Sequence, residues 1–232
     1  MRVRATFGAV FTGFPDEAFE FYEGLEADNS RVYWQDHKAI YESAVKGPLV
    51  ALTAEFPEYG DFHVFRPNRD VRFSANKLPY KTAQGAVAGD GAAGTYVQIS
   101  ATGLMAARGY YMMTPDQLAR FRAAVADDGS GPDVVAIVDS LRRAGYAVGA
   151  RDAVKSAPRG YPTDHPRIDL LRGKGLMMSR TWPHAAWQST KAVVGRVRKV
   201  WSDADPLVAW LDRHVGHSTE PLPPRGGRGA NR

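Results

Sequence analysis

The spacing of hydrophobic and polar residues predicts helices at the two ends of the chain and strands in the middle. In the first part, apolar side chains recur every three or four residues behind helix-starting residues, as in an amphipathic helix. We expect helices after Pro15, after Ser30 and over residues 49–56, with an interruption at Gly47-Pro48. Beyond this point the pattern changes from helical to extended.

The middle of the chain is rich in the β-branched and aromatic residues that favour strands. Residues 62–66, 96–100 and 104–113 are expected to be strands, and the last two are close enough to form a hairpin. Residues 69–73 give a weaker strand pattern. The glycine- and alanine-rich stretch 85–94 is expected to be a flexible loop, because it lacks the lysine and the strand-then-helix setting of a phosphate-binding loop.

Helix signals return in the last part of the chain. Thr114 begins a capping box with Gln117, and the helix behind it is expected to break at residues 127–132. A second helix then runs through Val135, Val138 and Leu141, and Gly145 is placed to end it. The remaining helices expected are a short one at residues 168–171, a long amphipathic one opened by Pro183, and a final one that starts at Asp205-Pro206 and stops at Gly216.

The segregation of helices from strands predicts an α+β fold with a mostly antiparallel central sheet flanked by N-terminal and C-terminal helices. A chain of 232 residues suits a single domain. We place this domain at residues 1–216. Residues 217–232 are rich in proline, glycine and arginine, and we expect them to form a disordered tail.

The composition removes several classes of function. The chain has no cysteine, which excludes disulfides, cysteine-ligated zinc, iron–sulfur clusters and thiol catalysis. No stretch approaches the roughly 18 apolar residues of a membrane span, and the N-terminus does not resemble a signal peptide. We therefore expect a soluble, cytoplasmic protein with no membrane partner and no metal or other cofactor. The oligomeric state is left open.

The net charge of +5 is unevenly distributed along the chain. Residues 66–81, the first cationic segment, carry five bases and one acid. Residues 151–180, the second cationic segment, carry seven bases and three acids, so each segment has a charge of +4. The tail adds +2, and the rest of the chain is net negative. Two cationic segments on an acidic body indicate a local site for an anion.

The first cationic segment supplies the main candidates for binding an anion. Arginine offers a planar fork and lysine a point charge for phosphate or carboxylate, while a tyrosine can stack on a ring or donate a hydrogen bond. The alternatives are an ion-pair network that pins this segment to the acidic first helix, and unrelated surface charge. The candidate binding residues are Arg66, Arg69, Arg72, Lys77, Tyr80 and Lys81.

The second cationic segment adds Arg159, in a Pro-Arg-Gly-Tyr turn, and the pair Asp164 and His165. Asp164 is placed to cap the helix that follows, and a helix N-terminus with nearby arginine can hold an anion. If the ligand is a substrate, Asp164 or His165 is the candidate acid or base, because histidine exchanges protons near neutral pH. Capping and turn geometry are the structural alternative.

We therefore expect one site, where the two cationic segments meet, for an anionic and phosphate-bearing small molecule. One alternative is a nucleic-acid-binding accessory domain, which the positive charge, the Arg/Gly tail and Tyr80 favour. Another is a non-catalytic module that receives an acidic surface of a protein partner. Whether the chain is an enzyme is left open.

Five stretches, taken in order, resemble a known family. They are FTGFPDEAFEFYEGLEADNSRVYW, HKAIYE with a following proline, RDVRFSANKLPYKT, YVQIS with the GYY of the expected hairpin, and PRGYPTDHPRIDLLRGKGL. Together they span about residues 11–215 and resemble the bacterial and fungal family called domain of unknown function 2461.

The resemblance implies a soluble α+β domain. It implies no reaction, because the family has no established one. The sequence departs from the family at Ala75-Asn76, where the family commonly has an acid before the lysine. We therefore expect no carboxylate role in the middle of the first cationic segment.

Overall fold

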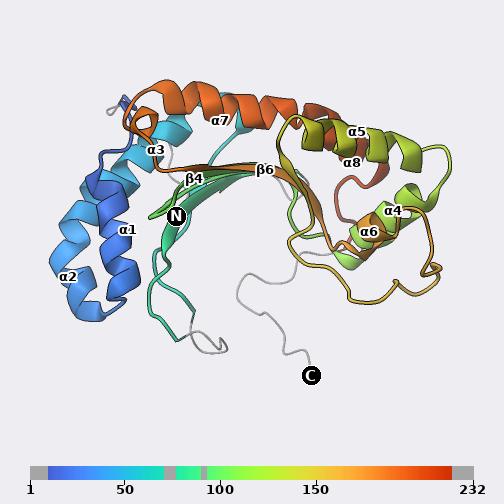
Figure 1. Ribbon diagram of the computed structural model, residues 1–232, viewed down its shortest axis with the longest axis horizontal. Helices are drawn as coiled ribbons and strands as arrows, with labels where there is room; N and C mark the ends of the chain where they lie inside the picture. Colours follow the sequence, from blue (N-terminus) through green and yellow to red (C-terminus); the bar gives the residue numbers. More distant parts are fainter. Residues whose placement is uncertain (1–9, 71–76, 90–92, 221–232) are drawn as a thin grey trace.

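The computed structural model describes residues 10–70, 77–89 and 93–220. Within these ranges, six strands form one antiparallel sheet in the order β1-β2-β3-β4-β6-β5 (Figure 1). The expected α+β fold with an antiparallel sheet is confirmed. The strands are β1 (His63–Val64), β2 (Ala83–Ala88), β3 (Gly94–Ser100), β4 (Gly103–Tyr110), β5 (Ala147–Gly149) and β6 (Leu176–Pro183).

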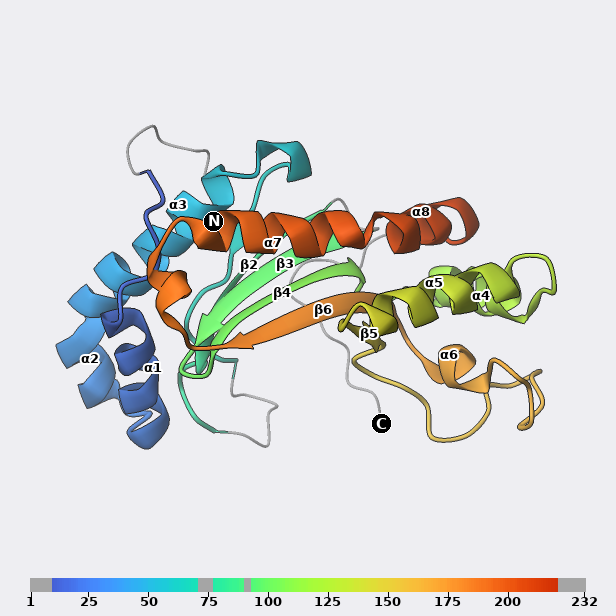
Figure 2. The same cartoon turned by 45° about the horizontal axis from the view of Figure 1, so that its top comes forward.

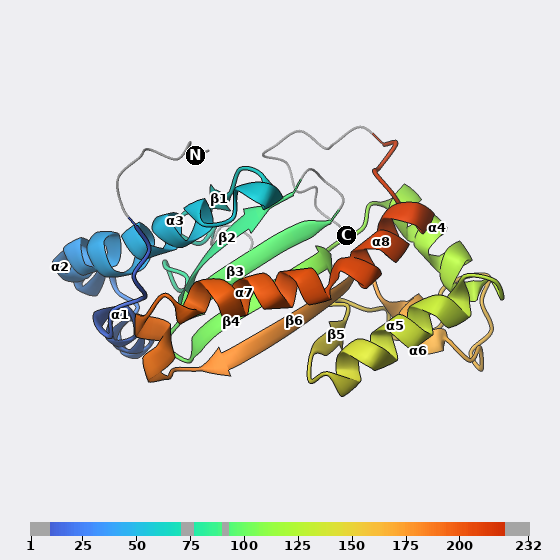
Figure 3. The ribbon, with the colours of Figure 1, turned by 90° about the horizontal axis from the view of Figure 1, so that it is seen from above.

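Helices pack against the ends of the strands and against one face of the sheet. The α-helices are α1 (Glu17–Ala27), α2 (Arg31–Ile40), α3 (Gly47–Ala54), α4 (Pro115–Ala126), α5 (Gly131–Arg143), α6 (Ile168–Arg172), α7 (Ala192–Asp203) and α8 (Asp205–His214). Shorter turns are the π-helical η1 (Tyr41–Lys46) and the 3₁₀ turns η2 (Pro57–Tyr59) and η3 (Ala186–Ser189). α1 and α2 stand at one end of the strands, and α4, α5 and α6 at the other (Figures 1 and 3).

α7 crosses one face of the sheet, with α3 and α8 beside it, and no helix of the described residues covers the opposite face (Figures 1 and 3). Side chains on β3 alternate accordingly, as a pleated strand requires. Val97 and Ile99 are fully buried, whereas Tyr96 and Gln98 are partly exposed. The covered side is that of Val97 and Ile99, because Thr95 on the same face lies opposite Arg108 of β4, and Arg108 Nη1 donates to the carbonyl oxygen of Trp201 in α7 at 2.7 Å. We call the uncovered side the open face.

Local sequence signals predicted several element boundaries. The hydroxyl oxygen of Ser30 accepts a hydrogen bond from the N–H of Tyr33 at 3.1 Å and caps α2. Thr114 and Gln117 form the expected capping box of α4. Gly103, the first residue of β4 after the hairpin turn, has a φ of 122°, which glycine adopts without strain. These predictions are confirmed.

The expected interruption at Gly47-Pro48 is wrong. The chain stays helical through the wide π-helical turn η1 and directly into α3. Pro48 lies in the first turn of α3, where a residue without an N–H donor fits a helix. The proline therefore marks a change of helix type and not a break.

The expected loop at residues 85–94 is wrong in its first part, because β2 continues to Ala88. Gly85 and Ala86 are small because their neighbours are close. A Cβ added to Gly85 would lie 2.4 Å from the hydroxyl oxygen of Tyr96, and Ala86 is fully buried. Small residues here reflect close packing and not flexibility. Residues 90–92 and 71–73, which belong to the expected loop and weaker strand, lie outside the described residues.

The sequence pattern did not predict β5 or β6. Pro183 ends β6 and does not open a helix, and α7 begins only at Ala192. β6 pairs with β4 on one side and β5 on the other, so this strand is stabilised by pairing with segments distant in sequence. Pairing over such distances leaves little local pattern to read.

Substituting Gly85 should show how tightly β2 is packed. Gly85→Ala is expected to lower the free energy of unfolding by about 1–3 kcal/mol, as overfilling a packed site does. Gly149→Ala is the control, because a Cβ added at Gly149 meets no atom within 4 Å, and it should be close to neutral. Urea unfolding of both variants measures the difference. Equal stability of the two variants would contradict the packing argument.

Candidate functional site

The two ends of the first cationic segment lie side by side. Asn68 and Tyr80 form an isolated antiparallel bridge, flanked by two backbone hydrogen bonds of 2.9 Å. This short ladder brings Arg66, Arg69 and Lys81 together, and we call these three residues the cation cluster.

Tyr80 anchors the ladder to the helices. Its ring stacks on that of Trp34, with centroids 4.4 Å apart and an angle of 10° between the planes. Its N–H donates to Asn29 Oδ1 at 3.0 Å, and its carbonyl oxygen accepts from Asn29 Nδ2 at 3.3 Å and from Arg69 Nε at 2.8 Å. Tyr80 is 7% exposed. Its ring therefore packs inside the protein, whereas the sequence analysis expected it to face a ligand.

In the part of the chain that the structure describes, the cation cluster has no compensating carboxylate. Lys81 Nζ donates to the carbonyl oxygen of Arg66 at 2.7 Å, and no acidic side chain among the described residues lies within ion-pair distance of the three cations. Burial, followed by the charges of Arg66 and Arg69, lowers the pKa of Lys81. Like charges therefore face one another here. Lys77 is exposed in the same segment, and Arg72 lies outside the described residues.

The loop that carries Arg159, Asp164 and His165 runs beside α6, toward the opposite end of the molecule from the first cationic segment (Figure 2). Arg159 and Asp164 are exposed, and His165 is half-buried. The Nδ1 atom of His165 accepts a hydrogen bond from the backbone N–H of Arg167 at 3.0 Å. The structure does not bring these residues to the cation cluster.

The cap expected from Asp164 is wrong. α6 begins at Ile168, with Arg167 at the N-cap position and no side-chain capping bond. A capping residue reaches N–H groups two or three positions ahead, and Asp164 lies too far upstream of the helix to do so. The ring of His165 bonds the chain entering α6 instead.

The cations nearest α6 are compensated, in contrast to the cation cluster. Arg167 Nη2 donates to the carbonyl oxygen of Ala126 at 2.7 Å and lies 3.0 Å from Asp128 Oδ1, and its side chain is only 12% exposed. It therefore ties α6 to the end of α4. Two further ion pairs in the same region are Arg172 with Asp169 and Lys174 with Asp152.

Beside the cation cluster, Phe65 and Tyr96 extend onto the open face. Lys81 Nζ lies 5.3 Å from the ring centroid of Phe65, which lies 6.3 Å from that of Tyr96. The hydroxyl of Tyr96 donates to Gln98 Oε1 at 2.7 Å, so the amide nitrogen of Gln98 keeps its hydrogens for another acceptor. Sequence reasoning missed these residues. The alternation in YVQIS, which puts Tyr96 and Gln98 on one face, is the signal that could have found them.

Tyr22 of α1 is buried close to Tyr41 and Tyr96. The residue is 1% exposed. Burial, with contributions from Tyr41 and Tyr96, raises the pKa of Tyr22, so its hydroxyl stays protonated at neutral pH. The hydroxyl of Tyr41 donates to Gln84 Oε1 at 2.7 Å.

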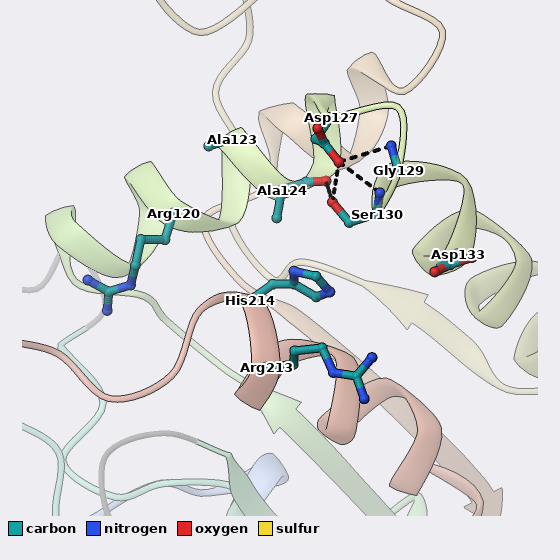
Figure 4. Close-up of a pocket in the computed structure, with 9 residues that line it drawn as sticks. All are labelled: Arg120, Ala123, Ala124, Asp127, Gly129, Ser130, Asp133, Arg213 and His214. Carbon is teal, nitrogen blue, oxygen red and sulfur yellow. Dashed lines mark hydrogen bonds between the residues drawn. The ribbon is translucent and has the colours of Figure 1, made fainter.

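A shallow hollow of 680 Å³ lies between α4, α5 and α8 (Figure 4). Asp127 Oδ1, in its wall, accepts hydrogen bonds from the backbone N–H groups of Gly129 and Ser130, each at 2.9 Å, and from the Ser130 hydroxyl at 3.0 Å. These bonds, chiefly those from Ser130, lower the pKa of Asp127. The ring of His214 packs 4.8 Å from that of Trp210. The Asp127 carboxylate stabilises the turn that leads into α5, so we place no functional site in this hollow.

Comparison with protein families supports the resemblance seen in the sequence. The family described as Conserved hypothetical protein (DUF2461) matches residues 17–210, most of the chain. The chain belongs to the DUF2461 family. No curated protein and no solved structure matches this DUF2461 chain. Family membership therefore brings no activity with it, and the site must be argued from its geometry.

Two further features bear on the class of DUF2461 function. Among the described helices, none is long and apolar enough to cross a membrane. The described ranges also contain no group of three or more His, Asp or Glu side chains placed to hold a metal ion.

In this DUF2461 domain, Arg167 should matter for stability and Arg159 should not. Arg167→Met removes the bonds to Ala126 and Asp128 and is expected to cost about 1–3 kcal/mol of unfolding free energy. Arg159→Met, at an exposed position without an ion pair, should be neutral within about 0.5 kcal/mol. Thermal and urea unfolding give both values. An Arg167→Met variant as stable as wild type would refute the bridging role.

Proposed function

We propose that this protein binds a phosphate-bearing ligand through the cation cluster of Arg66, Arg69 and Lys81. The supporting observation is that these cations lie together with no carboxylate partner among the described residues, and that burial, followed by the charges of Arg66 and Arg69, lowers the pKa of Lys81. Lys77 and Arg72 belong to the same segment and extend the proposed site in sequence. A cytoplasmic location remains part of the proposal.

The chemistry of the cluster suits an oxyanion. The bond from Arg69 Nε to Tyr80 fixes the guanidinium plane and leaves the two Nη groups for a ligand. The ammonium group of Lys81 donates one hydrogen to the carbonyl oxygen of Arg66 and has two more hydrogens available for a ligand. An anion placed among these donors offsets the repulsion between the cations and forms charge-assisted hydrogen bonds.

The proposal is for binding and includes no chemical step. Asp164 and His165, the candidate acid and base, lie beside α6, and His165 Nδ1 already accepts a backbone hydrogen bond. A group that moves a proton must reach the reacting atom. We therefore assign these two residues no catalytic part in the proposed site.

Inorganic pyrophosphate is a direct probe of the cation cluster. Arg66→Gln should weaken its binding about tenfold, which corresponds to one lost charge-assisted hydrogen bond. Arg159→Gln is the matched control, because both arginines are exposed, lack ion pairs and lose the same charge. Isothermal titration calorimetry measures both. Equal weakening by the two variants would show that only net charge matters, and the local site would be refuted.

The lowered pKa of Lys81 gives the site a pH dependence. Only protonated Lys81 attracts an anion, so affinity should fall by about tenfold as the pH rises, beginning below the pKa of an ordinary lysine. Sulfate is the suitable probe, because its charge is constant over this range. Lys81→Arg stays protonated and should remove the fall. The proposal fails on this point if both proteins show the same pH profile.

A further inference from the structure

The open face carries aromatic, amide and hydroxyl side chains. Strand register places Tyr96 on β3 opposite Ala107 on β4, and Ala107 opposite Ser179 on β6. None of the described strands contains an aspartate or glutamate. The face therefore has no negative charge of its own. The neighbouring row across β3, β4 and β6 holds Gln98, Met105 and Thr181.

Cations flank the aromatic side chains at both edges of this face. Near β1 stand Lys81 and Phe65, as described above. Near β5, the guanidinium carbon of Arg151 lies 5.3 Å from the ring centroid of Tyr111, which is 45% exposed. Arg151 also acts on Tyr96: burial raises the pKa of Tyr96 to about 12, and the charge of Arg151 opposes that rise. The rings of Phe65, Tyr96 and Tyr111 therefore lie between a cation on each side.

The width of the sheet decides the size of ligand that can meet both edges. Tyr111, over which Arg151 lies, directly follows β4, so three spacings of about 4.8 Å, roughly 14 Å across the sheet, separate it from β1. Nucleotides stacked as in a duplex strand rise about 3.4 Å each, so several are needed to cover this span. A mononucleotide reaches one edge only.

We propose that the open face binds single-stranded nucleic acid, with phosphates at its two cationic edges and bases stacked on Phe65, Tyr96 and Tyr111. The inference rests on the proposed function, because one of these edges is the cation cluster. An aromatic ring stacks on any base, and basic side chains follow the backbone, which is how sequence-tolerant single-strand binding works.

Two other polyanions fit the same observations less well. A duplex keeps its base faces stacked inside, so the rings of the open face would gain nothing from it. An acidic peptide supplies carboxylates but no flat rings to stack between the cations. Single-stranded nucleic acid supplies both complements that the open face requires: phosphates for its cations and unpaired bases for its aromatic rings.

The test uses a fluorescein-labelled single strand of about eight nucleotides, a length within the usual site sizes, and fluorescence anisotropy with the full chain. Tyr111→Ala should weaken binding by about tenfold through lost stacking. Arg151→Gln should weaken it several-fold and lower the slope of log affinity against log salt by about one. Tyr111 is 45% exposed, so its truncation should leave the fold intact, which thermal unfolding checks.

Matched controls keep the result specific. Arg159→Gln removes a distant exposed arginine, and Ile40→Ala removes an exposed apolar side chain, 38% exposed, on α2. Both should leave oligonucleotide affinity within about twofold. Tyr111→Ala and Arg151→Gln should also leave pyrophosphate affinity unchanged, because the cation cluster is intact in both variants.

The outcomes separate the two proposals. If Tyr111→Ala binds the oligonucleotide as tightly as wild type, or poly-glutamate or a duplex displaces it equally well, the nucleic-acid inference is overturned. The anion site would stand in either case, provided that Arg66→Gln still weakens pyrophosphate binding. Pyrophosphate binding that ignores Arg66→Gln refutes the anion site, whatever the oligonucleotide does.

Discussion

The backbone of Tyr80 fixes the position of the cation cluster. Both of its polar groups bond to the side chain of Asn29, its carbonyl oxygen also accepts from Arg69, and its ring stacks on Trp34. Buried backbone groups require partners, and here one of the partners is itself a cation of the cluster. The contacts that bury Tyr80 therefore also orient Arg69. A site held in this way is ordered before a ligand arrives, which lowers the entropic cost of binding.

The covered and open faces of the sheet have different requirements. α7 packs on the covered face, where Arg108 bonds to the Trp201 carbonyl oxygen at 2.7 Å and also pairs with Asp205 of α8. An antiparallel sheet can leave its other face to solvent when that face is polar. Serine, threonine and glutamine meet that need on the open face. The rings of Phe65 and Tyr96 are the exception, and they are among the surfaces on which we propose that bases stack.

Much of the fold was predictable because the sequence signals for its elements lie within a few residues of each other. The site was less predictable, because it depends on contacts between residues that are far apart in the sequence. The Ser30 cap, the Thr114 capping box and the β3–β4 hairpin are each encoded within a few residues. β6 pairs with strands about 30 and 70 residues away along the chain, so its pattern alone did not predict it. The burial of Tyr80 was not predicted for the same reason, because the ring it stacks on belongs to Trp34 of α2, which is distant in sequence.

The two cationic segments have the same formal charge and different physical roles. In the second, Arg167, Arg172 and Lys174 each pair with an aspartate, so much of that charge stabilises the loop around α6. In the first, Arg66, Arg69 and Lys81 bond only to backbone oxygens or to nothing in the described chain. The formal charge of a segment could not distinguish paired from unpaired cations, since pairing depends on where the fold places the acidic side chains. A partly buried cation such as Lys81, without a carboxylate partner among the described residues, is costly to the folded state, and this cost is the physical argument for the anion site that we propose.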